Sequence, residues 1–106
     1  MTGDQGFVLH PGAAQDITEI WEFIALENPG AATRFRQEIL EAIRKLIRFP
    51  HKGHKRTDLT SRPLRFHTVR QYLIAYAYQE KPLVVIGVIH GRRNPRLMAA
   101  ILRGRE

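Results

Sequence analysis

The apolar residues of the chain follow different spacings, and each spacing predicts a different kind of element. A short apolar run at residues 7–9 is closed by the turn signal His10-Pro11-Gly12, so we expect a first strand there. Residues 13–27 and residues 29–48 repeat their apolar positions every three or four residues, which predicts two amphipathic helices. Residues 83–89 contain no charged or polar side chain, which is typical of a strand buried on both faces.

The two predicted helices form one antiparallel hairpin, because only a short joint separates them. Asn28 can cap the second helix and Pro29 suits its first position, while Phe49-Pro50 ends it. Trp21 is most simply a core residue that bridges the first helix to the next element. The predicted buried face of the first helix consists of Ala14, Ile17, Ile20, Trp21 and Ile24, and that of the second consists of Ala32, Phe35, Ile39, Ala42, Ile43, Leu46 and Ile47.

Further strands are predicted after a polar, basic connector at residues 51–62. Residues 64–69 alternate apolar and polar positions, which predicts a half-buried strand. Residues 72–78 predict the next strand, whose three tyrosines lie on one face. The buried strand follows, and residues 95–103 then allow a short final helix.

Single residues refine this picture at two of the strands. Arg65 and His67 alternate with apolar positions and lie on one side of their strand, with Arg70 near them. Gly87 interrupts the buried strand and indicates a β-bulge or close packing against a helix.

The predicted order of elements is β-α-α-β-β-β, which defines an α+β fold over a single domain of residues 1–106. Short loops between the later strands imply antiparallel pairing. We therefore expect a mainly antiparallel sheet with the N-terminal helical hairpin packed on one face and room for a short C-terminal helix.

Composition excludes several classes of protein. The 106 residues include no cysteine, which rules out disulfides, thiolate chemistry and cysteine-ligated metals. The apolar runs are too short to span a bilayer. Residues 1–6 lack the basic start and apolar core of a signal peptide. We expect a soluble cytoplasmic protein that does not bind a membrane.

The net charge of +7 is concentrated in the second half of the chain. Residues 1–50 carry seven acids and five bases, whereas residues 51–70 carry six bases and one acid and residues 90–106 carry five bases and one acid. This asymmetry favours an anionic partner, either a nucleic acid or an acidic protein surface. A solvated basic face without a dedicated partner is the alternative.

No cofactor or metal site is indicated by the pattern of polar residues. Of the five histidines, only His51 and His54 are close in sequence, and they lie among lysines rather than carboxylates. The sequence shows no Ser/His/Asp arrangement and no glycine-rich phosphate loop.

The remaining candidates for chemistry are Arg65, His67, His90, Arg92 and Arg93. RNA cleavage by attack of a 2′-hydroxyl needs a base, an acid and cationic stabilisation of the phosphorane, and these residue types supply all three without a metal. Alternatively, the arginines pair with acids of the helices or contact a partner, and His90 caps the end of a strand. Both interpretations stay open at this point.

Short motifs in a constant order connect this chain with a known family. They are Phe7-Val8-Leu9-His10-Pro11, Ala14-x-Asp16-Ile17-x-x-Ile20, Asn28-Pro29-x-Ala31-Ala32-x-x-Phe35, Gly53-x-Lys55-Arg56-x-Asp58-Leu59, Tyr72-Leu73-Ile74-Ala75-Tyr76 and Val88-Ile89-His90-Gly91-Arg92-Arg93. Together they resemble the RelE/ParE superfamily of bacterial toxins over about residues 7–96. The resemblance implies a toxin of a type II toxin–antitoxin module, held inactive by a cognate antitoxin that is encoded beside it and that wraps an often acidic segment around it.

The resemblance also bears on the target. The RelE-like branch cleaves mRNA on the ribosome and commonly carries an arginine directly after the tyrosine of the third strand, where this chain has Leu73. That branch also tends to place an aromatic residue near its C-terminus, but no aromatic residue follows Tyr78 here. The chain is therefore more similar to ParE-like toxins, which inhibit DNA gyrase.

The ParE-like interpretation implies no catalytic residue, no cofactor and no metal. Its expected partner-binding residues are Arg65, His90, Arg92, Arg93 and Arg96. The alternative is a RelE-like, ribosome-dependent mRNA endonuclease, and its catalytic candidates are Arg65, His67, His90 and Arg92.

Overall fold

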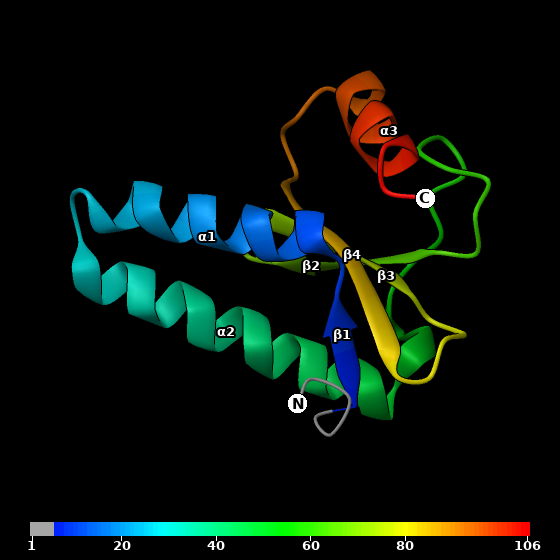
Figure 1. The fold of residues 1–106 in the computed structure, drawn as a ribbon, viewed down its shortest axis with the longest axis horizontal. Helices are drawn as coiled ribbons and strands as arrows, with labels where there is room; N and C mark the ends of the chain where they lie inside the picture. The colour runs from blue at the N-terminus through cyan, green and yellow to red at the C-terminus, as the bar shows by residue number, and fades with distance from the viewer. Residues whose placement is uncertain (1–5) are drawn as a thin grey trace.

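The computed structural model describes residues 6–106, and its helices and strands follow the predicted order (Figure 1). The elements are β1 (Phe7–Leu9), α1 (Pro11–Ala25), α2 (Pro29–Arg48), a short 3₁₀ helix η2 (Pro50–Lys52), β2 (Arg65–Val69), β3 (Tyr72–Ala77), β4 (Leu83–His90) and α3 (Pro95–Arg103). The predicted α+β class is confirmed, and the C-terminal helix that the sequence allowed is present. The expectation that the chain begins without a signal peptide falls largely on residues 1–5, outside the described range.

The four strands form one mixed sheet in the order β1-β4-β3-β2. The β2–β3 and β3–β4 pairs are antiparallel, as their short connections predicted, whereas β1 runs parallel to β4. The buried strand at residues 83–90 is thus an inner strand with a neighbour on each side.

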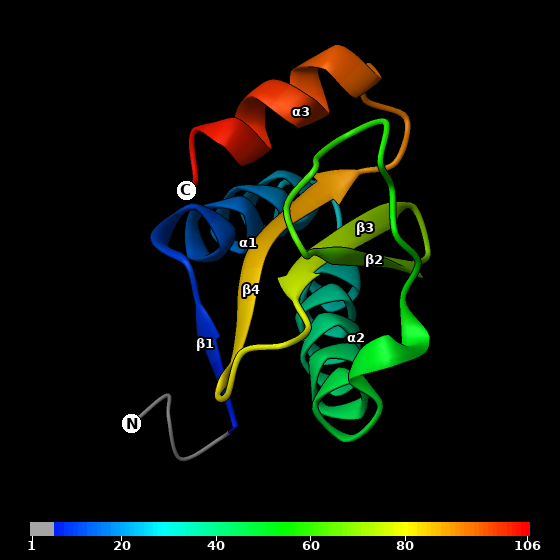
Figure 2. The same ribbon diagram turned by 90° about the vertical axis from the view of Figure 1, so that its right-hand side faces the viewer.

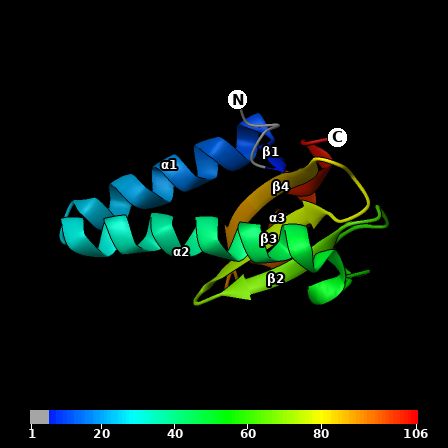
Figure 3. The same cartoon turned by 90° about the horizontal axis from the view of Figure 1, so that it is seen from below.

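The helical hairpin packs on one face of the sheet, as predicted (Figures 1 and 3). Each helix begins at a proline that follows a capping side chain. His10 Nδ1 accepts a hydrogen bond of 2.9 Å from the Gly12 N–H, and Asn28 Oδ1 accepts one of 3.0 Å from the Ala31 N–H. The core beneath the hairpin includes Phe35, Ile39, Ile43, Leu46, Ile74, Tyr76, Val85 and Val88.

The buried face of α1 differs from the predicted one at its first position. Ala13 is buried and Ala14 is exposed, so the prediction for Ala14 is wrong. Ala13 precedes Ile17 by four residues and Ile20 by seven, which places it on their face of the helix. The other predicted members of this face pack against the core, and the predicted face of α2 is confirmed.

The second face of the sheet is covered by α3 and by the connection between η2 and β2 (Figure 2). This smaller core consists of Leu59, Leu64, Phe66, Ala75, Ile86, Ile89, Met98 and Leu102. Because side chains of β4 contribute to both cores, the predicted burial of this strand on two faces is confirmed.

A β-bulge occurs in β4 where the sequence has Gly87. Ala75 of β3 pairs with Gly87, but the next residue, Tyr76, pairs with Val85, so Ile86 is the extra residue. A Cβ atom on Gly87 would lie 2.6 Å from Nη1 of Arg105. Both interpretations of this glycine, a bulge and close packing, therefore hold, although the close neighbour is an arginine side chain.

Candidate functional site

The end of the sheet where β4 finishes is built from two segments that lie far apart in sequence, the β2–β3 turn with the start of β3 and the end of β4. Tyr72, at the start of β3, pairs in register with His90, the last residue of β4. The Gly91 N–H donates a hydrogen bond of 2.7 Å to the Gln71 carbonyl in the β2–β3 turn. Arg70 adopts a φ of 54° in this tight turn, a left-handed conformation that is uncommon for residues other than glycine.

His90 is held by hydrogen bonds at both of its ring nitrogens. Nδ1 accepts a bond of 3.0 Å from the Arg92 N–H, and Nε2 lies 3.2 Å from Oε1 of Gln71. Because Nδ1 accepts, we assign the hydrogen of the neutral ring to Nε2, which donates it to the amide oxygen. The Tyr72 ring packs edge-on against the imidazole at 5.4 Å between centroids. His90 therefore caps the end of its strand, one of the two roles considered from the sequence.

Beyond His90, three arginines extend this end of the sheet into solvent. Arg92, Arg93 and Arg96 are exposed, and none of them forms an ion pair with any residue in the range 6–106. The alternative in which Arg92 pairs with an acid of the helices is thus not observed. We call His90, Arg92, Arg93 and Arg96 the cationic end.

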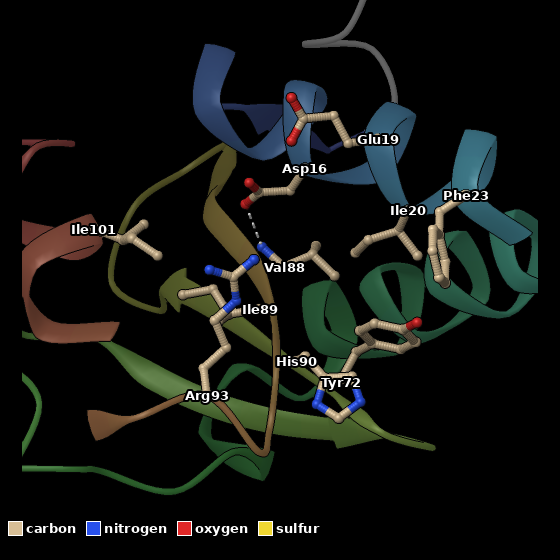
Figure 4. Close-up of a pocket in the computed structure, with 10 residues that line it drawn as sticks. All are labelled: Asp16, Glu19, Ile20, Phe23, Tyr72, Val88, Ile89, His90, Arg93 and Ile101. Atoms are coloured by element: carbon tan, nitrogen blue, oxygen red, sulfur yellow. Dashed lines mark hydrogen bonds between the residues drawn. The ribbon is translucent and has the colours of Figure 1, made fainter. Parts of the chain in front are cut away.

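A groove of about 280 Å³ runs from the cationic end along the side of α1 (Figure 4). Its apolar part comes from Ile20, Phe23, Val88 and Ile101, its acidic part from Asp16 and Glu19 of α1, and its basic part from His90 and Arg93. Opposite charges on its two walls and an apolar floor between them suit an amphipathic peptide segment better than a small metabolite.

Arg65 lies apart from the cationic end. It pairs in register with Tyr76, four residues along β3 from the partner of His90. Its Nη1 donates a hydrogen bond of 2.8 Å to the Gly53 carbonyl, and its guanidinium carbon lies 4.7 Å from the centroid of the Tyr78 ring. The side chain therefore holds the segment after α2 against the sheet.

His67 faces a different groove, between β2 and α2. Burial, together with the charges of Lys52, His54 and Lys45, holds its pKa below the usual range of histidine. It pairs with Ile74 of β3, so β3 separates it from β4. Strand spacing and rise put the backbones of His67 and His90 roughly 12 Å apart. Of the four residues considered for RNA cleavage, the structure brings together only His90 and Arg92.

The order of elements, the helical hairpin and the basic end of an inner strand can be compared with known families. One family model, described as the ParE toxin of type II toxin–antitoxin systems, matches residues 7–95. The chain belongs to this family. The resemblance drawn from the short motifs is thereby confirmed, and the protein is a toxin of a type II system with an antitoxin as partner. A comparison with individually curated proteins found no match.

The toxin also has features that its sequence pattern did not reveal. Asp16 is not a member of the predicted apolar face of α1, yet its side chain is largely buried and reaches β4. Phe23 and Leu26 lie off the apolar stripe and are 74% and 83% exposed. In the sequence, the signal for this exposure is that both residues lie outside the i, i+3, i+4 spacing of the buried face. Within residues 6–106, no helix is long and apolar enough to cross a membrane, and no cluster of three His, Asp or Glu side chains is arranged around a metal position.

Proposed function

We propose that this toxin inhibits DNA gyrase and that it acts by binding rather than by catalysis. The observation that carries the proposal is the arrangement of the possible acid and base residues. A ribonuclease of this kind needs a base and an acid on either side of one phosphate. His90 has both ring nitrogens engaged in hydrogen bonds, His67 faces another groove, and Arg65 donates a hydrogen bond to a backbone carbonyl.

The cationic end and the groove beside α1 support a second part of the proposal, in which they bind the antitoxin. Arg92, Arg93 and Arg96 form no ion pair with any residue between 6 and 106, so an acidic segment would gain charge-assisted hydrogen bonds without first breaking such a pair. The apolar floor of the groove would take the hydrophobic side of the same segment. We therefore expect neutralisation by an acidic, amphipathic stretch of a cognate antitoxin.

A supercoiling assay with purified gyrase, relaxed plasmid and ATP tests the proposed activity. We expect the full-length toxin to block supercoiling and to trap cleaved DNA, and we expect the cognate antitoxin to reverse both effects. Primer extension on mRNA from cells that express the toxin provides the comparison. Unchanged supercoiling at saturating toxin, together with new cuts within translated codons, would contradict the proposal.

The antitoxin surface can be tested separately by calorimetry. We expect the Arg92→Ala/Arg93→Ala double variant to bind the antitoxin at least about tenfold more weakly, with a smaller dependence on salt. Arg44→Ala is the matched control, since Arg44 is an exposed arginine on α2, away from the groove. Equal loss in the control would show that the effect comes from net charge and not from this surface.

A further inference from the structure

The free end of the helical hairpin carries large apolar side chains that neither core uses. The hairpin extends past the sheet, and its turn at residues 26–28 lies at the far end of the molecule (Figures 1 and 3). Phe23 and Leu26, in the last turn of α1 and directly after it, are the two most exposed of the large apolar residues between 6 and 106. Exposed apolar groups that lie side by side commonly mark a binding surface.

These side chains belong to a second stripe on α1. Glu19, Glu22, Phe23 and Leu26 have the spacing i, i+3, i+4 and i+7, which places them on one face of the helix. This face is turned away from the core stripe and combines two apolar side chains with two exposed carboxylates. We call these four residues the tip surface. Beside it, the Arg36 guanidinium covers the ring of Trp21 at 5.9 Å, which keeps the indole in place.

The charge of the tip surface is opposite to that of the rest of the toxin. The chain has a net charge of +7, yet neither Glu19 nor Glu22 forms an ion pair within residues 6–106. A partner with an apolar pocket and basic residues at its rim would match both features of this surface. Outside the groove, Glu22 would repel an acidic antitoxin segment, whereas the arginines of the cationic end would attract it.

We propose that the tip surface is the contact through which the toxin binds its target protein, at an apolar pocket with a basic rim. This inference rests on the proposed function, in which the target is gyrase. Leu26 is the central contact, and Glu22 aligns the helix by charge. Leu26 and Glu22 do not line the groove, whereas Glu19 and Phe23 line it from the α1 side. A segment seated in the groove would cover Glu19 and Phe23, so antitoxin and target would compete for these two side chains.

The test compares two variants of the tip surface with two matched controls, all as full-length chains. Leu26→Ala removes the apolar contact and Glu22→Lys reverses the charge. Phe49→Ala removes a side chain that is 59% exposed at the opposite end of α2, and Glu80→Lys reverses an exposed charge in the β3–β4 turn. Each chain is assayed for inhibition of supercoiling, growth arrest on induction, antitoxin affinity, sedimentation mass and thermal midpoint.

We expect each tip variant to need at least about tenfold more protein for half-inhibition of supercoiling. Growth arrest should be lost, while antitoxin affinity and the thermal midpoint stay at the wild-type values. The two controls should behave as wild type in every assay. This separation of target binding from antitoxin binding is the result that supports the tip surface as the target contact.

Other outcomes would overturn the inference or would separate it from the proposed function. Full growth arrest by both tip variants would refute it. Loss of antitoxin affinity alone would assign the surface to the antitoxin, and a wild-type dimer that Leu26→Ala dissociates would assign it to a second copy. If wild-type toxin arrests growth without inhibiting gyrase, and the tip variants do not arrest growth, the gyrase target is wrong and the target-binding role of the tip stands.

Discussion

Asp16 in α1 and Arg105 just after α3 form a bidentate ion pair against the edge of β4. The carboxylate and guanidinium meet at 2.6 and 2.9 Å. β1 pairs with β4 only as far as Val85, and the ion pair bonds the backbone beyond that point. Asp16 accepts the Val88 N–H at 2.9 Å, and Arg105 donates to the Ile86 carbonyl at 3.1 Å. Two side chains thus replace the missing strand and fasten the C-terminal helix to α1.

Replacing Asp16 should destabilise the fold more than replacing Arg105. Asp16→Ala leaves the Val88 N–H without an acceptor and the Arg105 guanidinium without its counter-charge, with only the Ile86 carbonyl, among residues 6–106, to accept from it. Both side chains of the pair are only about 15% exposed. We expect Asp16→Ala to lower the free energy of unfolding by about 2–3 kcal/mol and Arg105→Ala by about 1–2 kcal/mol. Urea denaturation followed by circular dichroism measures both. Arg103→Ala, in an exposed position of the same helix, should change stability by less than about 0.5 kcal/mol.

Gly87→Ala should act through the same ion pair. The new Cβ would lie 2.6 Å from Nη1 of Arg105 and 3.3 Å from Oδ2 of Asp16, so the guanidinium has to leave its position. We expect a loss of about 1–3 kcal/mol in the wild-type background and a clearly smaller loss in the Arg105→Ala background. A double-mutant cycle in urea measures the difference. Equal losses in the two backgrounds would mean that Gly87 is needed for the bulge itself.

Tyr76→Phe should loosen the connection between α2 and β2. The Tyr76 hydroxyl is buried, donates to the Pro50 carbonyl at 2.6 Å and accepts the Gly53 N–H at 2.9 Å. Removing it leaves two backbone groups without a partner, which should cost about 1–3 kcal/mol. Hydrogen exchange at Gly53 should become faster. Tyr78→Phe is the control, since among residues 6–106 its hydroxyl accepts only a long, exposed hydrogen bond of 3.4 Å from the Gln79 side chain. A similar loss of stability in Tyr78→Phe would contradict this explanation.

The stability of the toxin should fall in mild acid because of His67. Burial and the nearby cations Lys52, His54 and Lys45 hold its pKa below 6.5 in the folded state. As the pH falls below about 6.5, the unfolded chain binds this proton more readily than the folded chain, so the free energy of unfolding decreases. The decrease ends once the pH is below the folded-state pKa. We expect His67→Gln to reduce the difference in thermal midpoint between pH 7.5 and pH 5.5, and Lys52→Gln to reduce it partly. An unchanged difference in His67→Gln would assign the acid sensitivity to other groups.

The architecture of the toxin could be predicted from its sequence, but only part of the candidate site could be. The sequence places His90, Arg92 and Arg93 together because they are neighbours at the end of one strand, and their role in binding stays a prediction. Whether Arg65 and His67 would join them depended on the register of β2 against β3 and on the faces of the sheet. The structure places Arg65 against the η2 segment and His67 beside α2, and no local pattern distinguishes these positions.

The spacing of apolar residues by itself determined the helices, the strands and the antiparallel pairing, since these depend on residues close in sequence and on the length of loops. The tertiary structure alone decided which distant side chains meet. Asp16 and Arg105 are 89 positions apart, and their contact exists only because α3 folds back over β4. It also decided what remains exposed. Phe23 and Leu26 are apolar, but the core lies on the other side of α1, so the fold leaves them on the surface.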